Sequence, residues 1–236
     1  MQRDSFSCEN YLVFSIYLLP MHLYNIHTHK IESAKENGYD IKCILNTYPG
    51  DFEQKKQMYP GIWFSCGIHP WFSDGSDELF TLLKKNVEDP DVVAIGEAGL
   101  DKLRGPDIAK QTVIFRKQAE LAIEVQKPVI IHCVKAWDEM IALYKEYKGA
   151  VPWIIHGYRG NPEQTKQLCK AGFKFSLGEH FNRESVKHIP LNSVFCETDT
   201  SDVTICKVYE NISAEIGLSL NRFATLAAEN IKNTFR

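Results

Sequence analysis

The sequence lacks the features that mark several large classes of protein. Its apolar N-terminal stretch, Tyr11 to Leu19, is too short to span a bilayer. No block of like charges occurs, and the formal net charge is -3 over 236 residues, so a large nucleic-acid-reading surface is not expected. The phosphate loops G-x-G-x-x-G and G-x-x-x-x-G-K-[ST] are also absent. A small phosphorylated substrate stays compatible with this composition, because a metal site supplies positive charge locally.

Cysteine is present but never in a paired C-x-x-C arrangement. The seven cysteines are odd in number and scattered, so the sequence indicates neither a disulfide framework nor a zinc-thiolate site. A reducing environment fits such free thiols, and we expect a cytoplasmic protein. Four of the cysteines lie in apolar strand-like runs, where cysteine behaves as a small buried hydrophobe: Cys43, Cys66, Cys133 and Cys196.

The first 20 residues are expected to be an extension outside the folded unit. They make a poor signal peptide, because Arg3 is offset by Asp4 and Glu9 and no small-residue cleavage site follows the apolar run. The strand pattern begins only after Met21, and we hypothesise that Met21 is the physiological start. No repeat, linker or low-complexity stretch divides the rest, so residues 21–236 are expected to form a single domain.

Short apolar runs alternate with longer amphipathic ones along the whole of this unit. The runs are rich in Val and Ile, as is typical of parallel strands buried on both faces. Eight of them are predicted to be strands: Leu23 to His27, Ile41 to Thr47, Ile62 to Ile68, Val92 to Glu97, Pro128 to Cys133, Trp153 to His156, Lys174 to Leu177 and Val194 to Glu197.

Helices are predicted between most of these strands. Five segments have the helical period: Asp77 to Glu88, Ile108 to Gln126, Trp137 to Tyr147, Pro162 to Ala171 and Val203 to Ile216. Eight strands alternating with helices favour a closed (β/α)8 TIM barrel, with an open doubly wound sheet as the alternative.

The first and last segments of the predicted barrel domain depart from the regular strand–helix alternation. Only Lys30 to Asp40 and Tyr48 to Gly61 are available for the first two crossovers, which are therefore expected to be shortened. The final segment, Asn221 to Phe235, is expected to be an amphipathic helix packed on the barrel exterior.

Metal-binding residue types recur at the ends of the predicted strands. His27 and His29 follow the first strand at i and i+2, a spacing that directs two side chains to one face. Four later strands end on or just before Glu97, His132, His156 and Asp199. The carboxyl ends of barrel strands surround a single mouth, where the active sites of this fold lie. Charged and imidazole groups there are costly unless they are paired or bind metal, so the set predicts a metal centre.

These segments resemble the TatD-like metal-dependent hydrolases, also called TatD-family deoxyribonucleases, within the wider amidohydrolase-type barrels. The resemblance runs from Met21 to the end of the chain, and its most specific motif is Ile95-Gly96-Glu97-Ala98-Gly99-Leu100-Asp101. The other matching positions are His27-Thr28-His29, Gly67-Ile68-His69-Pro70, Gln111, Phe115, Gln118, Leu121, Val129 to His132, Ile155-His156, Gly160, Glu197-Thr198-Asp199 and Asn230 to Phe235.

The resemblance implies two divalent ions and a role for each matching residue. His27, His29 and Asp199 would hold one ion, His132 and His156 the second, and Glu97 would bridge both. This mix of imidazole and carboxylate suits Zn, Mn, Ni or Mg. The implied reaction is hydrolysis of a phosphoester by a metal-activated water, with Asp199 handling the proton. DNA ends or short oligonucleotides would be the substrate, cleaved in an exonuclease manner.

Several loop residues differ from the family pattern or have a less certain role. In the family, a small residue and an arginine often follow the histidine that matches His132, whereas this chain has Cys133-Val134. Because that arginine is missing, Lys135 or Arg159 is a candidate phosphate contact. His69 is a candidate substrate contact rather than a metal ligand. The loops after His156 and Asp199 also differ, as Gly157-Tyr158-Arg159 and Thr200-Ser201-Asp202. Three aromatic residues offer faces for a base, although loop packing is the favoured interpretation: Trp71, Phe72 and Tyr158.

Two other functions stay open at this point. One is a metallohydrolase of a small-molecule ester or amide, although amidohydrolases commonly use lysine where this chain has Glu97. The other is a metal-binding module that has lost turnover, which the complete set of six ligands opposes. The sequence does not reveal the metal, the natural substrate or the oligomeric state.

Overall fold

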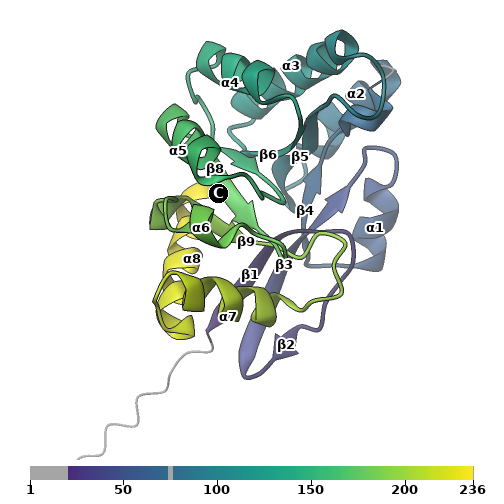
Figure 1. The fold of residues 1–236 in the computed structure, drawn as a ribbon. Helices are drawn as coiled ribbons and strands as arrows, with labels where there is room; N and C mark the ends of the chain where they lie inside the picture. Colours follow the sequence, from purple (N-terminus) through teal and green to yellow (C-terminus); the bar gives the residue numbers. More distant parts are fainter. Residues whose placement is uncertain (1–20, 74–76, 236) are drawn as a thin grey trace, which may run out of the picture.

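Eight parallel strands form a closed barrel. The computed structural model describes residues 21–73 and 77–235. Neighbouring strands pair in the order β1 (His22–Thr28), β3 (Tyr39–Thr47), β4 (Trp63–Cys66), β5 (Val92–Asp101), β6 (Val129–Val134), β7 (Trp153–Ile155), β8 (Lys174–Leu177) and β9 (Val194–Cys196). An isolated parallel bridge between Thr28 of β1 and Asp199, three residues after β9, closes the barrel. The predicted TIM barrel is therefore confirmed, and the open-sheet alternative is wrong (Figure 1).

The first two crossovers are short, as predicted. The first contains no helix within the described residues, only strand β2 (Lys35–Glu36), which pairs antiparallel with β3. The second contains the seven-residue helix α1 (Phe52–Met58). Strand β5 runs further than the predicted end at Glu97, because Gly99 to Asp101 stay in register with His132 to Val134 of β6.

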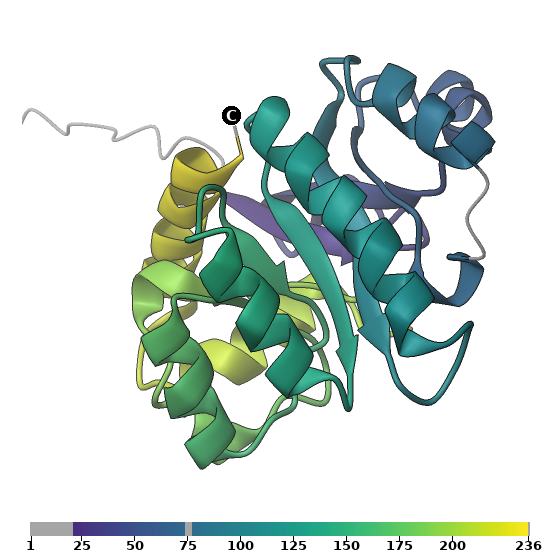
Figure 2. The same cartoon turned by 90° about the horizontal axis from the view of Figure 1, so that it is seen from above.

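Helices surround the barrel on the outside of the strands (Figure 2). After α1, they are in chain order η1 (Pro70–Phe72), α2 (Asp77–Asn86), α3 (Ile108–Glu124), α4 (Trp137–Glu146), α5 (Pro162–Ala171), α6 (Arg183–Val186), η2 (Leu191–Ser193), α7 (Ile205–Glu215) and α8 (Leu220–Thr234).

Local sequence explains where several of these helices begin and end. The side chains of Asp107 and Asn161 accept backbone hydrogen bonds from Lys110 and Gln164, which caps α3 and α5. Helix α5 ends at Gly172, which has a φ of +107° that other residues rarely adopt.

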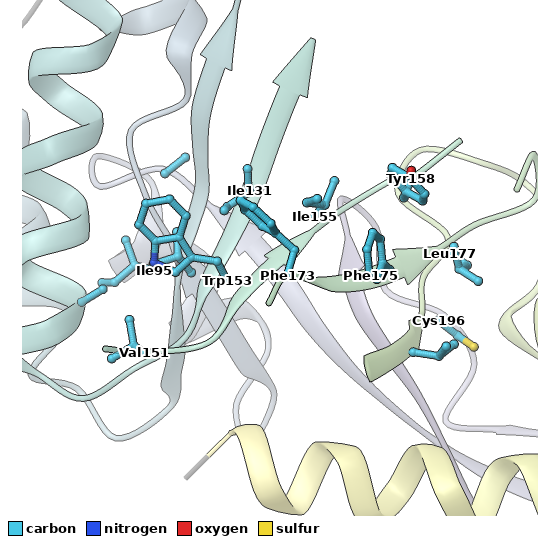
Figure 3. Close-up of a cluster of buried hydrophobic side chains, with 14 of the residues drawn as sticks. Ile95, Ile131, Val151, Trp153, Ile155, Tyr158, Phe173, Phe175, Leu177 and Cys196 are labelled. Atoms are coloured by element: carbon cyan, nitrogen blue, oxygen red, sulfur yellow. The ribbon is translucent and has the colours of Figure 1, made fainter. Parts of the chain in front are cut away.

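The alternation of side chains along the strands divides the core into two apolar clusters. Ile131, Ile155 and Cys196 point outward into the larger cluster beneath the helices, where Trp153 and Phe173 also pack (Figure 3). Their neighbours in sequence point inward and fill the barrel interior: Ile130, Ile154 and Phe195, together with Ile26, Ile44 and Ala94. This inner cluster forms the floor beneath the residues at the carboxyl ends of the strands.

Helix α8 does more than cover the exterior of the barrel. Its Ile231 and the following Phe235 join the inner cluster, and the rings of Phe195 and Phe235 are 5.9 Å apart. The Asn230 amide donates hydrogen bonds to the backbone carbonyls of Leu191 in η2 and Val194 at the start of β9. The end of the chain therefore closes the barrel interior at the amino ends of the strands, opposite the predicted mouth.

Candidate metal centre

The fold brings all six predicted ligand residues together around Glu97. Its Oε1 lies 2.7 Å from Nδ1 of His132 and 2.8 Å from Nε2 of His156. Its Oε2 lies 3.5 Å from Nε2 of His27 and 3.7 Å from Nε2 of His29. Each oxygen of this one carboxylate thus faces a different pair of histidines.

Asp199 completes the side of the centre that contains the first histidine pair. Its Oδ1 lies 3.7 Å from Nε2 of His27 and 3.5 Å from Nε2 of His29. The Asp199 N–H donates to the carbonyl of His27, and the His29 N–H donates to the carbonyl of Asp199. The hydrogen bonds that close the barrel therefore also bring these three residues together.

The surroundings of His27 test whether a metal ion fits. Its side chain is fully buried, and neither ring nitrogen has a hydrogen-bond partner among the residues that the structure describes. Burial, followed by the nearby charge of His156, holds the pKa of His27 well below its usual range. A buried neutral imidazole with an unused lone pair is costly unless something binds it. Groups of His, Glu and Asp around it have ligand atoms within 4.8 Å of one another, so the residues present fit a divalent ion.

Three glycines let the neighbouring backbones approach closely around Glu97. A Cβ on Gly99 would lie 1.8 Å from the carbonyl oxygen of His132, and one on Gly96 would lie 2.7 Å from that of Ile130. A Cβ on Gly67 would meet the backbone of Gly96 at 2.8 Å. The glycines of the I-G-E-A-G-L-D motif are thus required by packing, and they bring Glu97 and His132 within hydrogen-bonding distance.

His69 enters the centre as a hydrogen-bond donor. Its Nδ1 accepts the backbone N–H of Trp71 at 3.2 Å, so the ring proton is assigned to Nε2. That Nε2 lies 3.1 Å from Oε1 of Glu97. Burial lowers the pKa of His69 from its usual value. Although its position would let it join Glu97 and His132 around an ion, a protonated Nε2 cannot ligate a metal. The geometry is that of a neutral donor.

Comparison with known proteins assigns the family. The family model described as TatD related DNase matches residues 20–236. This chain belongs to the TatD family.

Named relatives agree with this assignment. A 3'-5' ssDNA/RNA exonuclease TatD of Erwinia billingiae is 31% identical over 72% of this chain and 70% of its own length. An uncharacterized metal-dependent hydrolase, YabD of Bacillus subtilis, is 31% identical over 88% of both chains. The expectation of a metal-dependent hydrolase acting on ester bonds is confirmed at the level of the family.

Solved structures show the same fold. A TatD-family hydrolase of Entamoeba histolytica superposes with a TM-score of 0.74 at 20% identity, over 92% of this chain and 99% of its own. The TatD homologue YJJV of Escherichia coli superposes with a TM-score of 0.76 at 21% identity, over 90% and 97%. In residues 21–73 and 77–235, no helix has the length and apolar character needed to cross a membrane.

Asp101 lies behind His132 in this TatD-family centre, and the sequence analysis gave it no role. Its Oδ2 lies 3.1 Å from Nε2 of His132 and accepts the indole N–H of Trp71 at 2.7 Å. Its Oδ1 accepts the backbone N–H groups of Leu103 and Arg104. Burial alone would raise the pKa of Asp101, but these hydrogen bonds lower it. The sequence signal was the aspartate that follows the largely apolar run Val92 to Leu100.

Glu197 has the corresponding position behind His156, and its role was also missed. Its Oε1 accepts the Gly157 N–H at 2.7 Å and lies 3.4 Å from Nδ1 of His156. The side chain is fully buried, and burial raises its pKa. His156 therefore directs Nε2 to Glu97 and Nδ1 to Glu197. The sequence signal was the glutamate two positions before Asp199 at the end of an apolar strand.

Two glutamines of α3 hold the backbone beneath the centre. The Gln118 side chain accepts the Ile68 N–H at 2.7 Å and donates to the Ile68 carbonyl, next to His69. The Gln111 side chain makes the same pair of bonds with the backbone of Asp101. These two paired contacts give a physical reason for the glutamine spacing in the sequence.

The two predicted phosphate contacts lie at the rim of the centre. Lys135 and Arg159 are exposed, and both line a cavity of about 550 Å³ that also reaches His132, His156 and Asp199. Arg159 and Asp199 border a second cavity of about 530 Å³ as well. Arg159 is therefore positioned between two spaces that open onto the same centre.

Tyr158 cannot offer its face to a base. Its side chain is 2% exposed, and its hydroxyl lies 2.8 Å from that of Thr165. Loop packing is the correct interpretation for this residue.

Proposed function

We propose that this chain is a two-metal phosphodiesterase that shortens single-stranded DNA or short oligonucleotides from an end. One observation supports this most strongly: the two oxygens of Glu97 face separate histidine pairs, 2.7–2.8 Å away on one side and 3.5–3.7 Å away on the other. A bridging carboxylate between two sets of ligands suits a pair of ions rather than one. The substrate class is taken from the Erwinia relative, which is named a 3'-5' ssDNA/RNA exonuclease.

The proposal gives each residue of the centre a role. His27, His29 and Asp199 hold the first ion, His132 and His156 hold the second, and Glu97 binds both. Zn, Mn, Ni or Mg suits these ligands. When bound, such ions polarise a phosphoryl oxygen and acidify a water molecule.

The surrounding side chains act directly on the substrate and its protons. Asp199 is about one-third exposed and borders both cavities, so its carboxylate can accept a proton from the attacking water. The Nε2–H of His69, which faces Oε1 of Glu97 at 3.1 Å, points into the centre and would turn to a phosphate oxygen when substrate binds. Arg159 and Lys135 bind phosphates beside it, because they are the cations that line the cavities around the histidines.

A direct test is hydrolysis of a 5'-labelled single-stranded DNA 10-mer with Mg, Mn, Zn or Ni. The wild type is compared with Glu97→Gln, which keeps the shape but removes the bridging charge, and with Glu53→Gln as a control on the exposed face of α1. We expect a ladder of shortened products from the wild type and the control, and none from Glu97→Gln. Metal content, measured for each protein, is expected to be about two ions in the wild type and fewer in Glu97→Gln.

Other outcomes would point to a different function. Two bound ions with no cleavage of DNA or RNA, but turnover of a small ester, would favour a small-molecule metallohydrolase. Bound metal without turnover of any ester would favour a non-catalytic metal-binding module.

We further propose that residues 21–236 form one domain that acts in the cytoplasm, with residues 1–20 as an extension. The family match from residue 20 and the free state of the six described cysteines support this. Residues 1–20 lie outside the described residues, so the expected start at Met21 stays a prediction. Intact mass of the cellular protein tests this point, since retention of residues 1–20 would contradict a start at Met21.

A further inference from the structure

Phe72 is an exposed aromatic ring beside the metal centre. It is 52% exposed, and it is the one aromatic residue among the large hydrophobic side chains exposed in residues 21–73 and 77–235. Single exposed hydrophobic side chains are common on protein surfaces, so the case for a role rests on where the Phe72 ring lies.

The segment that carries Phe72 is firmly held. The indole of Trp71 donates to Asp101 at 2.7 Å, and the guanidinium of Arg104 lies 3.7 Å over the Trp71 ring. The Phe72 N–H donates to the carbonyl of His69 at 2.9 Å. Gly105 packs so closely that a Cβ there would lie 2.8 Å from the Pro70 carbonyl. Phe72 is therefore exposed on a preorganised turn rather than on a loose one.

The His69 imidazole lies between the Phe72 ring and Glu97. The ring centroids of Phe72 and His69 are 6.2 Å apart, and Nε2 of His69 lies 3.1 Å from Oε1 of Glu97. On another side, Tyr48 meets Phe72 edge to face with centroids 5.6 Å apart and an interplanar angle of 87°. Tyr48 directly follows β3 at the barrel mouth, and burial together with the Glu97 charge raises its pKa. Phe72 and Tyr48 thus form an aromatic corner at the edge of the centre.

We propose that this corner is a stacking subsite for a nucleobase next to the scissile phosphate. In a nucleotide, one sugar ring lies between the base and the phosphate. In the protein, one imidazole ring, that of His69, lies between Phe72 and Glu97, so the two spacings are similar. A phosphate at the centre would therefore place its nucleobase beside the exposed face of Phe72. Stacking on an aromatic ring is tolerant of sequence, because every base has a π face. The subsite rests on the proposed function and adds a contact to the base, which the metal centre itself does not supply.

The test compares oligonucleotides that have or lack the relevant base. Three single-stranded 10-mers are used: one intact, and two with a tetrahydrofuran abasic residue on one or the other side of the terminal phosphodiester. The proteins are the wild type, Phe72→Leu, which is apolar but not aromatic, and Phe72→Tyr. Leu103→Ala is the control, because Leu103 is also an exposed hydrophobic side chain, on the loop that follows β5.

We expect Phe72→Leu to lower kcat/KM on the intact oligonucleotide by a factor on the order of ten, and Phe72→Tyr to retain it. With one of the two abasic substrates, wild type and Phe72→Leu should be equal. Leu103→Ala should match the wild type throughout. An equal loss on all three substrates, or no loss on any, would overturn the subsite.

Binding separates this inference from the proposed function. Fluorescence anisotropy with the Glu97→Gln protein, with and without Phe72→Leu, measures affinity for the same oligonucleotides without turnover. A base-dependent difference in affinity despite inactive wild-type protein would support the subsite and reject the nuclease activity. No base-dependent difference in an active enzyme would reject the subsite alone.

Discussion

Asp101 accepts a hydrogen bond from Nε2 of His132 at 3.1 Å, on the side of the imidazole away from Glu97. In a neutral His132 this contact would hold the proton on Nε2 and leave the lone pair of Nδ1 for an ion on the side of Glu97, whose Oε1 lies 2.7 Å from Nδ1. His156 has the opposite arrangement, with Nδ1 toward Glu197 and Nε2 toward Glu97. Two buried carboxylates thus orient the two histidines of the second proposed ion.

Substitution Asp101→Asn is expected to weaken metal binding by roughly 10- to 100-fold. Both oxygens of Asp101 accept N–H donors, so the amide group of asparagine would face a donor in either orientation. Competition with a chromophoric chelator for Zn or Mn measures the affinity. Trp71→Phe is the matched control, because it removes only the indole hydrogen bond. An affinity equal to that of the wild type in Asp101→Asn would contradict the positioning role.

Substitution Gly99→Ala is expected to destabilise the fold by about 3 kcal/mol. The added Cβ would lie 1.8 Å from the carbonyl oxygen of His132, so β5 and β6 must separate. Urea unfolding of the metal-free protein measures the change. Gly50→Ala serves as the control, because nothing lies within 4 Å of its Cβ position. Equal stability of the two variants would show that the strands do not need this close approach.

Substitution Phe235→Ala is expected to lower the free energy of unfolding by about 3 kcal/mol. Phe235 is 6% exposed and fills the amino end of the barrel interior against Phe195. The metal centre lies at the other end of the strands, so metal affinity should be unchanged at temperatures where the variant is folded. Thermal unfolding and metal titration together check this. Loss of metal affinity in a folded variant would contradict the separation of the two ends.

Cys66, which is buried, and Cys133, which is partly buried, are expected to resist alkylation in the native protein at about pH 8. Burial raises the pKa of Cys133 to about 12 and that of Cys66 to about 11, so both stay protonated and unreactive. In the unfolded chain a thiol has a pKa of about 8.5 and reacts readily. Iodoacetamide labelling followed by peptide mass spectrometry, with and without guanidinium, measures the difference. Rapid native labelling of Cys133 would show that its environment opens.

Much of the fold was predictable because it follows from local periodicity. Apolar runs such as Val129 to Cys133 are typical of buried parallel strands, and all eight predicted strands are present. The period does not fix which side chains of α3 are buried: Val113 is 55% exposed, while the adjacent Ile114 is buried. The ends of an element and its buried face depend on the residues that pack against it in space, and sequence periodicity predicts these only approximately.

The convergence of the six proposed ligands was predictable for a topological reason. Parallel strands in a barrel all end at the same mouth. The position of a histidine or carboxylate at a strand end therefore follows from the strand assignment alone. The residues that orient those ligands could not be identified in this way. Asp101 and Glu197 act through single hydrogen bonds to His132 and His156, and such contacts depend on side-chain direction across neighbouring strands.

The sequence by itself therefore determined the barrel, its family and the chemical types gathered at its mouth, because these follow from residue order and from strand polarity. Only the tertiary structure decided how those groups are used. It assigned the proton of His69 through the Trp71 backbone, buried Tyr158, exposed Phe72, and brought the end of α8 into the barrel interior. The physical reason is that tautomer, burial and stacking depend on atoms distant in sequence, whose separations no local pattern encodes.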